Sequence, residues 1–166
     1  VRVSMPGMSA LPPILLEDEL LIAFEKPSGL LIAPDRWSKE TVNLMQLVHA
    51  RLSPGIFNAH RLDRDTSGVV LCAKQKPALD ALCLQFERGE VEKEYLALVH
   101  GAPPAASGEI DQPISDDPQR PGKSKIDRRG KPALTRYETE HAFRGWTLLR
   151  LRPQTGRTHQ LRVHLK

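Results

Sequence analysis

The sequence is poor in cysteine and in aromatic residues, and it contains no long hydrophobic run. Its two cysteines, Cys72 and Cys83, lie in apolar stretches without CxxC spacing. We therefore expect buried thiols in a reducing compartment rather than a disulfide or a metal site. No apolar run approaches the length of a membrane-spanning helix, and the N-terminus has no signal-peptide pattern. These absences predict a soluble cytoplasmic protein with no membrane partner.

The rest of the composition is typical of one globular domain with a moderate basic excess. The 166 residues include 24 basic and 20 acidic side chains, which gives a net charge of +4. This excess suits a polyanionic partner but does not require one, because many soluble proteins carry as much. Residues 1–13 are rich in Pro, Gly and Met and are expected to form a loose segment ahead of a domain over 14–166.

The residue pattern predicts strands and helices that mix without strict alternation, which favours an α+β fold with a mixed sheet. Buried-type strands are expected at Gly68–Ala73, with both faces covered, and at Tyr95–Val99. A helix starting at Pro77 would present Leu79, Leu82, Cys83 and Phe86 on one face and end at Gly89. The other expected elements are strands at Leu20–Phe24, Leu30–Ala33, Leu134–Thr139 and Trp146–Arg152, and helices at Thr41–Leu52 and Thr158–Lys166, the last with Thr158 as N-cap.

Residues 101–132 form the least regular part of the sequence. They are rich in Pro, Gly and charge, with acidic residues first and basic residues after them. The pattern fits a solvated surface loop and an RNA-contacting loop equally well.

Common catalytic and metal-binding motifs are missing. Gly122-Lys123-Ser124 resembles the end of a phosphate-binding loop, but its required first glycine falls at Asp117. There is no HExxH or GxSxG, and His159 and His164 are five residues apart, a spacing that does not align two ligands on one helix face. We predict no metal site.

Two polar clusters remain as candidates for chemistry. His60-Arg61-Leu62-Asp63-Arg64-Asp65-Thr66-Ser67-Gly68 has one apolar side chain in nine residues and leads directly into a predicted core strand. Such a segment is either a solvent loop or a functional loop. Residues 153–162 follow a strand and open a helix, a setting suited to anion binding.

These clusters resemble the two signature motifs of the RluA family of RNA pseudouridine synthases: HRLDRDTSG at 60–68 and RPQTGRTHQLRVH at 152–164. Residues 92–97 resemble that family's tyrosine motif, and residues 25–30 and 130–135 resemble weaker elements. The resemblance runs in the family's order over about residues 18–166. It implies a mostly antiparallel central sheet flanked by helices, and an isomerase that converts uridines of structured RNA to pseudouridine.

The resemblance also implies roles for individual residues. Asp63 is the essential carboxylate, acting by covalent attack or by proton abstraction. Arg162 pairs with that carboxylate and keeps it charged. Tyr95 stacks on the target uracil, and Leu161 lines the base pocket. No cofactor is expected, because the isomerisation involves no hydride, phosphoryl or redox step.

The predicted partner is rRNA or tRNA, bound by a monomeric chain through Arg61, Arg64, Arg157 and His60. Arg61 and Arg64 fit phosphate binding and simple solvation equally well. His60, His159 and His164 more often orient loops than catalyse, and Asp65 is expected to serve the hydrogen bonds of the Thr66–Gly68 turn.

Two other functions fit part of the pattern. One is a non-catalytic RNA-binding or assembly module with the same fold, and the weaker one is a nucleoside glycosidase, which would need a second carboxylate. The resemblance further implies that the catalytic domain continues beyond Lys166, so that its C-terminal part is missing here. It leaves no room before residue 14 for the small RNA-binding domain of some relatives.

Overall fold

The computed structural model describes residues 10–34 and 41–166. The chain divides into two compact units, Val1–Arg88 and Gly89–Lys166, and each is described by itself. The region expected to be one domain, 14–166, therefore spans both units. Most of the predicted loose segment 1–13 lies outside the described residues.

The first unit is built on a four-stranded antiparallel sheet with the order β1-β2-β4-β3. Two of its strands confirm predictions, because the expected strand at 20–24 overlaps β2 and the one at 68–73 is β4. The expectations did not include β1 or the short β3. The four strands are β1 (Ile14–Glu17), β2 (Leu21–Lys26), β3 (Phe57–Asn58) and β4 (Gly68–Ala73).

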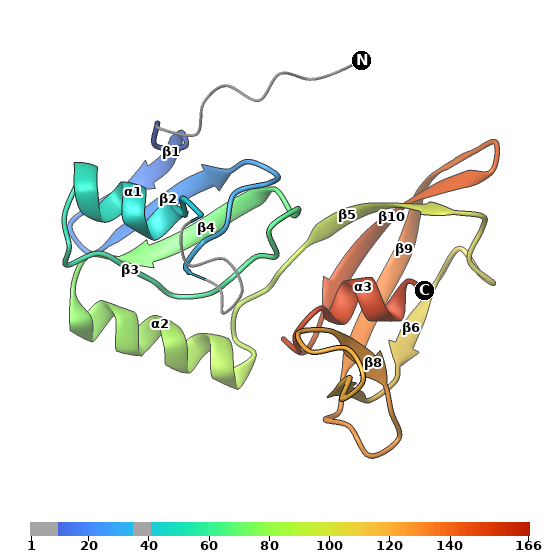
Figure 1. Cartoon of the computed structure of the whole chain (residues 1–166). Coiled ribbons are helices and arrows are strands. Elements are labelled where there is room, and N and C mark those ends of the chain that lie inside the picture. Colours follow the sequence, from blue (N-terminus) through green and yellow to red (C-terminus); the bar gives the residue numbers. More distant parts are fainter. Residues whose placement is uncertain (1–9, 35–40) are drawn as a thin grey trace. The chain divides into compact units, whose positions relative to one another are not determined.

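Two helices pack on this sheet, and both were predicted. α1 (Leu44–Arg51) begins with a capping box in which Asn43 and Gln46 exchange side-chain and backbone hydrogen bonds. α2 (Lys76–Arg88) is followed by Gly89 in the left-handed conformation, at φ +72°. Figure 1 shows α1 on one side of the sheet and α2 on the other.

The predicted strand at 30–33 is wrong. Leu31 makes only an isolated bridge with Asn43. The carbonyl oxygens of Leu31 and Ile32 instead accept hydrogen bonds from the first backbone N–H groups of α1, at 2.8 Å from Leu44 and 3.0 Å from Met45. These N–H groups have no partner inside their own helix, so the segment serves as a cap rather than as a strand.

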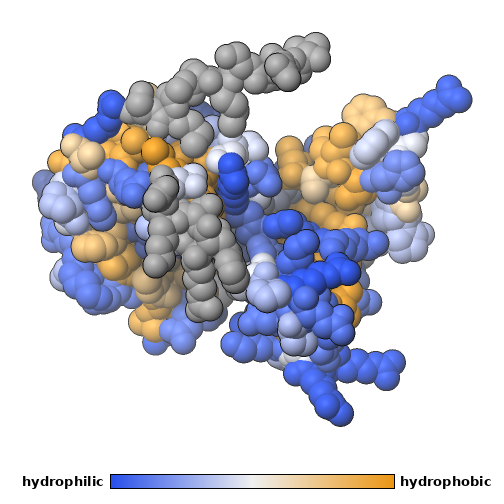
Figure 2. Space-filling model, viewed as in Figure 1, coloured by the Kyte–Doolittle hydropathy of each residue, from blue (hydrophilic) through white to orange (hydrophobic). Residues whose placement is uncertain are grey.

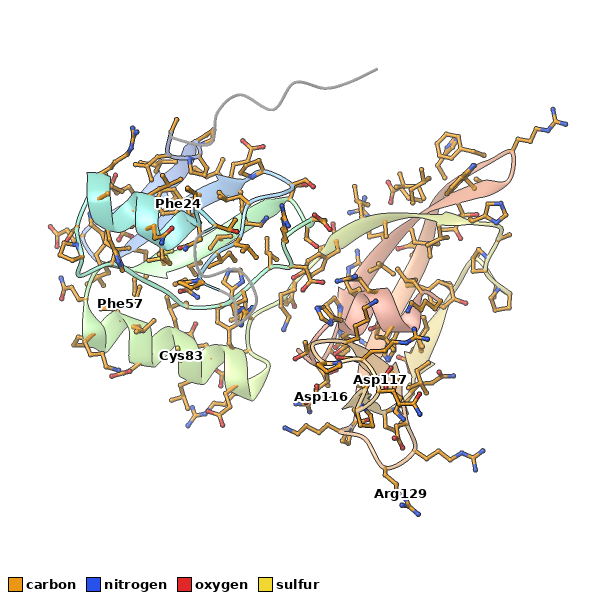
Figure 3. All side chains as sticks on the ribbon, viewed as in Figure 1. Phe24, Phe57, Cys83, Asp116, Asp117 and Arg129 are labelled. Carbon is orange, nitrogen blue, oxygen red and sulfur yellow. The ribbon has the colours of Figure 1, made fainter. Side chains whose placement is uncertain are left out.

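Two burial predictions in this unit are also wrong. Val69 of β4 is 56% exposed, so the strand is not covered on both faces. Cys83 is exposed on α2 (Figure 3), while Leu82 is the buried residue of that helix. Cys72 does lie in the core, where burial raises the pKa of its thiol to about 12.

The second unit contains an antiparallel sheet with the order β5-β10-β9-β6 and one short helix, α3 (Gln160–His164). The strands predicted at 134–139 and 146–152 are confirmed, although both extend further. The sheet consists of β5 (Tyr95–His100), β6 (Ser107–Asp111), β9 (Leu134–Phe143) and β10 (Trp146–Pro153).

The strand at 95–99 was expected to be fully buried, and this is wrong. β5 lies at an edge of its sheet, with Leu96 and Leu98 60% and 58% exposed. Phe143 and Trp146, which pair across the β9–β10 turn, are also exposed, and Figure 2 shows hydrophobic surface over the upper part of the second unit. Tyr95, Ala97 and Val99 alternate with Leu96 and Leu98 on the opposite face, which is half-buried.

Part of the segment 101–132 is regular structure rather than loop. It contains β6 and a separate antiparallel pair, β7 (Ile114–Asp116) with β8 (Ser124–Ile126). All pairings between named strands are antiparallel, and the α+β class is confirmed. Within the described part of the chain, no helix has the length and hydrophobicity needed to cross a membrane.

The turn after β8 depends on Gly130. A Cβ atom at this position would come within 2.5 Å of the backbone carbon of Ile114. We predict that Gly130→Ala lowers the free energy of unfolding by roughly 1–3 kcal/mol, because the backbone must move to admit the methyl group. Urea denaturation would measure this change. Gly156→Ala is the matched control, since a Cβ at Gly156 meets no atom within 4 Å. Equal stability of the two variants would contradict the prediction.

Candidate active site

Asp63 lies in the loop that joins β3 to β4 in the first unit. Its side chain is half-buried, and its carbonyl oxygen accepts a hydrogen bond of 3.1 Å from the Thr66 backbone N–H. This bond closes a turn over residues 63–66, which we call the Asp63 turn. Leu62, immediately before the turn, packs against the hydrophobic core. The backbone of Asp63 is therefore held between a core contact and a core strand.

A buried lysine that the sequence analysis missed holds this turn. Lys26, the last residue of β2, is 0% exposed. Its Nζ donates hydrogen bonds to the carbonyl oxygens of Leu30 (2.7 Å), Pro27 (2.9 Å) and Arg64 (2.9 Å). All three N–H groups of the ammonium are thus used, which makes its burial tolerable.

The charge of Lys26 is balanced nearby. Burial lowers the pKa of the Lys26 ammonium, and the carboxylates of Asp65 and Asp63 oppose this effect. The sequence does contain a signal for this residue. In β2, Ile22, Phe24 and Lys26 alternate on the buried face, so the strand period places the lysine inward.

Three more hydrogen bonds fasten the 26–29 segment to the Asp63 turn. The backbone N–H of Gly29 donates to the Arg64 carbonyl at 2.9 Å, and Arg64 Nε donates to the Gly29 carbonyl at 3.2 Å. Ser28 Oγ donates to the Asp65 carbonyl at 2.8 Å. Arg64, predicted to bind RNA, is exposed but also serves the loop itself. Asp65 takes part here through its backbone carbonyl oxygen. The side chain of Asp65 was expected to serve the turn that follows, but the Thr66 N–H donates to the carbonyl oxygen of Asp63.

The side chain of His60 stabilises the structure of the loop. Its Nε2 accepts a 3.0 Å hydrogen bond from the Leu71 backbone N–H, and its ring lies 4.9 Å from that of Phe86 in α2. A ring nitrogen that accepts from an N–H carries no proton, so Nδ1 holds the hydrogen of a neutral imidazole. This arrangement supports the loop-orienting role for His60. Arg61, the neighbouring predicted RNA contact, is exposed.

The second polar cluster lies in the second unit, at the end of β10 and in α3. The predicted N-cap, Thr158, is wrong: His159 occupies that position in the left-handed conformation, at φ 55°, and makes no side-chain cap. The reason lies in Gln160, whose Oε1 accepts hydrogen bonds from the Arg157 N–H at 3.0 Å and the Thr155 hydroxyl at 2.7 Å. A buried glutamine therefore organises the turn that a threonine was expected to cap.

Gln160 belongs to a buried polar network that the sequence analysis missed. Its Nε2 donates to the Leu134 carbonyl and to Thr135 Oγ1, both at 3.0 Å. Thr135 Oγ1 also lies 2.9 Å from His164 Nδ1, and His164 Nε2 lies 3.0 Å from the Gln112 carbonyl. The Gln112 carbonyl oxygen can only accept, so His164 Nε2 carries a hydrogen and donates it. The network ties α3 to β9, and with it Leu161 and Arg162.

The remaining predicted residues of the second unit have distinct settings. Tyr95 begins β5 opposite Leu151 of β10 and is half-buried. In α3, Leu161 is half-buried and Arg162 is exposed. Arg157, predicted to bind RNA, donates from Nε to the Pro132 carbonyl at 2.9 Å.

Ion pairs hold the residue before Tyr95. Glu94 bonds Arg150, and it lies 3.0 Å from Arg152, both on β10. Arg150 also bonds Glu140 of β9 at 2.7 Å, and this hydrogen bond lowers the pKa of the Glu140 carboxyl. These charges lie on the exposed face of the sheet and fix the start of β5, where Tyr95 stands.

The predicted site residues therefore form two sets. His60, Arg61, Asp63 and Arg64 belong to the first unit, and Tyr95, Arg157, Leu161 and Arg162 to the second. Within residues 10–34 and 41–166, no three His, Cys, Asp or Glu side chains are grouped as metal ligands.

Comparison with known proteins identifies the family. Residues 20–166 match the family model described as RNA pseudouridylate synthase, so the chain belongs to this family. Within it the chain is a member of the RluA group. It is 42% identical over 154 residues to the dual-specificity RNA pseudouridine synthase RluA of Escherichia coli, covering 92% of this chain and 70% of that protein.

Two further matches show how much of the chain and of each related protein is covered. The chain is 40% identical over 166 residues to the ribosomal large subunit pseudouridine synthase D of Borreliella burgdorferi; this match covers 92% of the chain but only half of that protein. The structure of human RNA pseudouridylate synthase domain containing 1 matches with a TM-score of 0.79 and 28% identity, covering 97% of this chain and 66% of that one. The chain thus spans about half the length of some curated relatives.

The buried network around Thr135 gives a stability prediction. Thr135→Val keeps the side-chain shape but leaves Gln160 Nε2 and His164 Nδ1 without their shared partner. We expect the free energy of unfolding to fall by about 1–3 kcal/mol, measured by urea denaturation. Thr139→Val, at a half-buried position on the same strand, is the control and should change stability little. An unaltered stability of Thr135→Val would show that the hydroxyl does not sustain the network.

Proposed function

We propose that this chain is the catalytic part of an enzyme that converts specific uridines of structured RNA to pseudouridine. The observation that carries the proposal is the setting of Asp63, a half-buried carboxylate in a turn fixed by a buried ammonium, within a chain of this family. The N1–C1′ bond of the nucleotide breaks, the uracil turns, and a C5–C1′ bond forms. The C5 hydrogen leaves as a proton and N1 gains one, so no oxidant or cofactor is needed.

In this proposal Asp63 acts on the sugar or the base, by covalent attack or by proton abstraction. Arg162 forks onto the Asp63 carboxylate and keeps it charged. Tyr95 stacks on the uracil once the nucleotide has left its stack, and Leu161 lines the pocket. The support for these roles is the match of each residue to the motifs. The Lys26 hydrogen bonds and the Thr135 network also give Asp63 and α3 rigid backbones.

The proposed substrate is rRNA or tRNA. One relative is named as dual-specific and another as acting on the large ribosomal subunit, and both classes are polyanions that suit a net charge of +4. Arg61 and Arg64, both exposed, are proposed to contact phosphates. We propose that the enzyme works in the cytoplasm as a monomer.

Replacement of Asp63 tests the proposal. Asp63→Asn keeps the size of the side chain and should lower release of tritium from [5-³H]uridine in bulk RNA at least about 100-fold, because the catalytic carboxylate is gone. RNA affinity should remain close to that of the unaltered chain.

Asp65→Asn is the matched control, since Asp65 lies two residues away in the same loop and is exposed. It should retain most of the activity. Unchanged tritium release by Asp63→Asn would overturn the proposal and favour a non-catalytic RNA-binding module. Release of free uracil by the unaltered chain, lost in both variants, would favour a glycosidase with two carboxylates.

A further inference from the structure

Residues 113–131 comprise β7, β8 and the turns around them, are rich in charged side chains, and are called the basic hairpin below. These 19 residues carry six basic and three acidic side chains, a net charge of +3, compared with +4 for the whole chain. The basic hairpin therefore has twice as many basic as acidic side chains, although residues 144–162, a stretch of the same length, carry five basic and no acidic side chains. Figure 2 shows hydrophilic surface over the lower part of the second unit.

The backbone of the basic hairpin is ordered by two of its acidic residues. Asp127 Oδ1 accepts from the Arg129 N–H at 2.9 Å and Oδ2 from the Ser115 hydroxyl at 3.2 Å, and these bonds lower the pKa of the Asp127 carboxyl. Asp117 Oδ1 accepts from the Gln119 N–H at 3.0 Å. Gly130 fits against the backbone of Ile114, and Ile114 pairs with Lys131.

The basic side chains, in contrast, are exposed to solvent. Lys123, Arg128, Arg129 and Lys131 are all exposed, and no ion pair involves them among the described residues. Figure 3 shows Arg129 extending away from the end of the turn after β8. Lys125 and Arg120 are only loosely paired, at 3.7 Å from Asp127 and 4.0 Å from Asp117.

We propose that the basic hairpin is a phosphate-binding surface for the RNA substrate, in which Lys123, Arg128, Arg129 and Lys131 bind the RNA backbone away from the target uridine. Two of the three acidic side chains bond the backbone of the hairpin itself, and the four exposed cations have no ion pair within the described chain, so they are available to phosphates. Lysine and arginine on a rigid support bind phosphates without reading bases, so the surface gives affinity and orientation rather than sequence choice. This inference rests on the proposed function for the identity of the RNA.

The salt dependence of binding tests the inference. Each phosphate that the protein neutralises releases counterions, so the slope of log K against log salt becomes shallower by about 0.7–0.9 for each phosphate that a variant no longer neutralises. Binding of a fluorescein-labelled tRNA stem-loop to the full chain would be measured by anisotropy between about 50 and 200 mM salt. We expect Arg128→Gln/Arg129→Gln to weaken binding about ten-fold at the lower salt and to reduce the slope by about 1.4–1.8.

Arg144→Gln is the matched control. Arg144, like Arg129, is an exposed arginine in a tight turn directly before a glycine. It should leave both affinity and slope unchanged. A change in slope for Arg144→Gln that is half that of the double variant would show that only net charge matters, and an unchanged slope in the double variant would show that the surface does not meet RNA. A double variant that loses binding only to an acidic polypeptide such as polyaspartate would also overturn the inference.

This outcome is separable from that of the proposed function. Asp63→Asn removes a group that the inference does not use, and its slope should equal that of the unaltered chain. If Asp63→Asn still releases tritium, the catalytic assignment fails while the binding result stands. If it does not, and the slope of Arg128→Gln/Arg129→Gln is unchanged, only the role of the basic hairpin fails.

Discussion

The constraint on which the candidate site depends is the burial of one ammonium group. Lys26 is fully buried, and its three donors are used by three carbonyl oxygens, one of them from Arg64 in the Asp63 turn. A buried ammonium without one of these acceptors would carry a large desolvation penalty, so the sheet and the loop cannot separate without cost. The position of the Asp63 backbone is thereby coupled to the core of the first unit.

In the second unit, side-chain hydrogen bonds rather than a buried ammonium group hold the corresponding polar segment in place. α3 has only five residues and no side-chain cap, so it has little stability of its own. Gln160, Thr135 and His164 hold it on β9 through hydrogen bonds that are buried from solvent. Both signature motifs therefore contain side chains that point inward to fix the backbone, and others, such as Arg61 and Arg162, that remain exposed.

The sequence predicted the α+β class, two of the three helices with nearly their observed limits, and the main strands, because hydrophobic period and turn residues are local signals. The predictions were wrong where contacts between residues far apart in the chain determine the local structure. The carbonyls of Leu31 and Ile32 cap α1 instead of forming a strand, and Gln160 displaces Thr158 as the organiser of its turn. The motifs supplied Asp63, but the support from Lys26 depends on a hydrogen bond between residues 38 apart in the chain.

The most direct test of this account is the kinetics of Lys26→Met, which keeps the volume and removes the ammonium. If Lys26 fixes the Asp63 turn, kcat should fall about 100-fold while KM for RNA stays unchanged, because misplacement of the proposed catalytic carboxylate costs chemistry rather than binding. Protection of Cys72 from alkylation would confirm that the assayed molecules are folded. Full kcat in folded Lys26→Met would contradict the account.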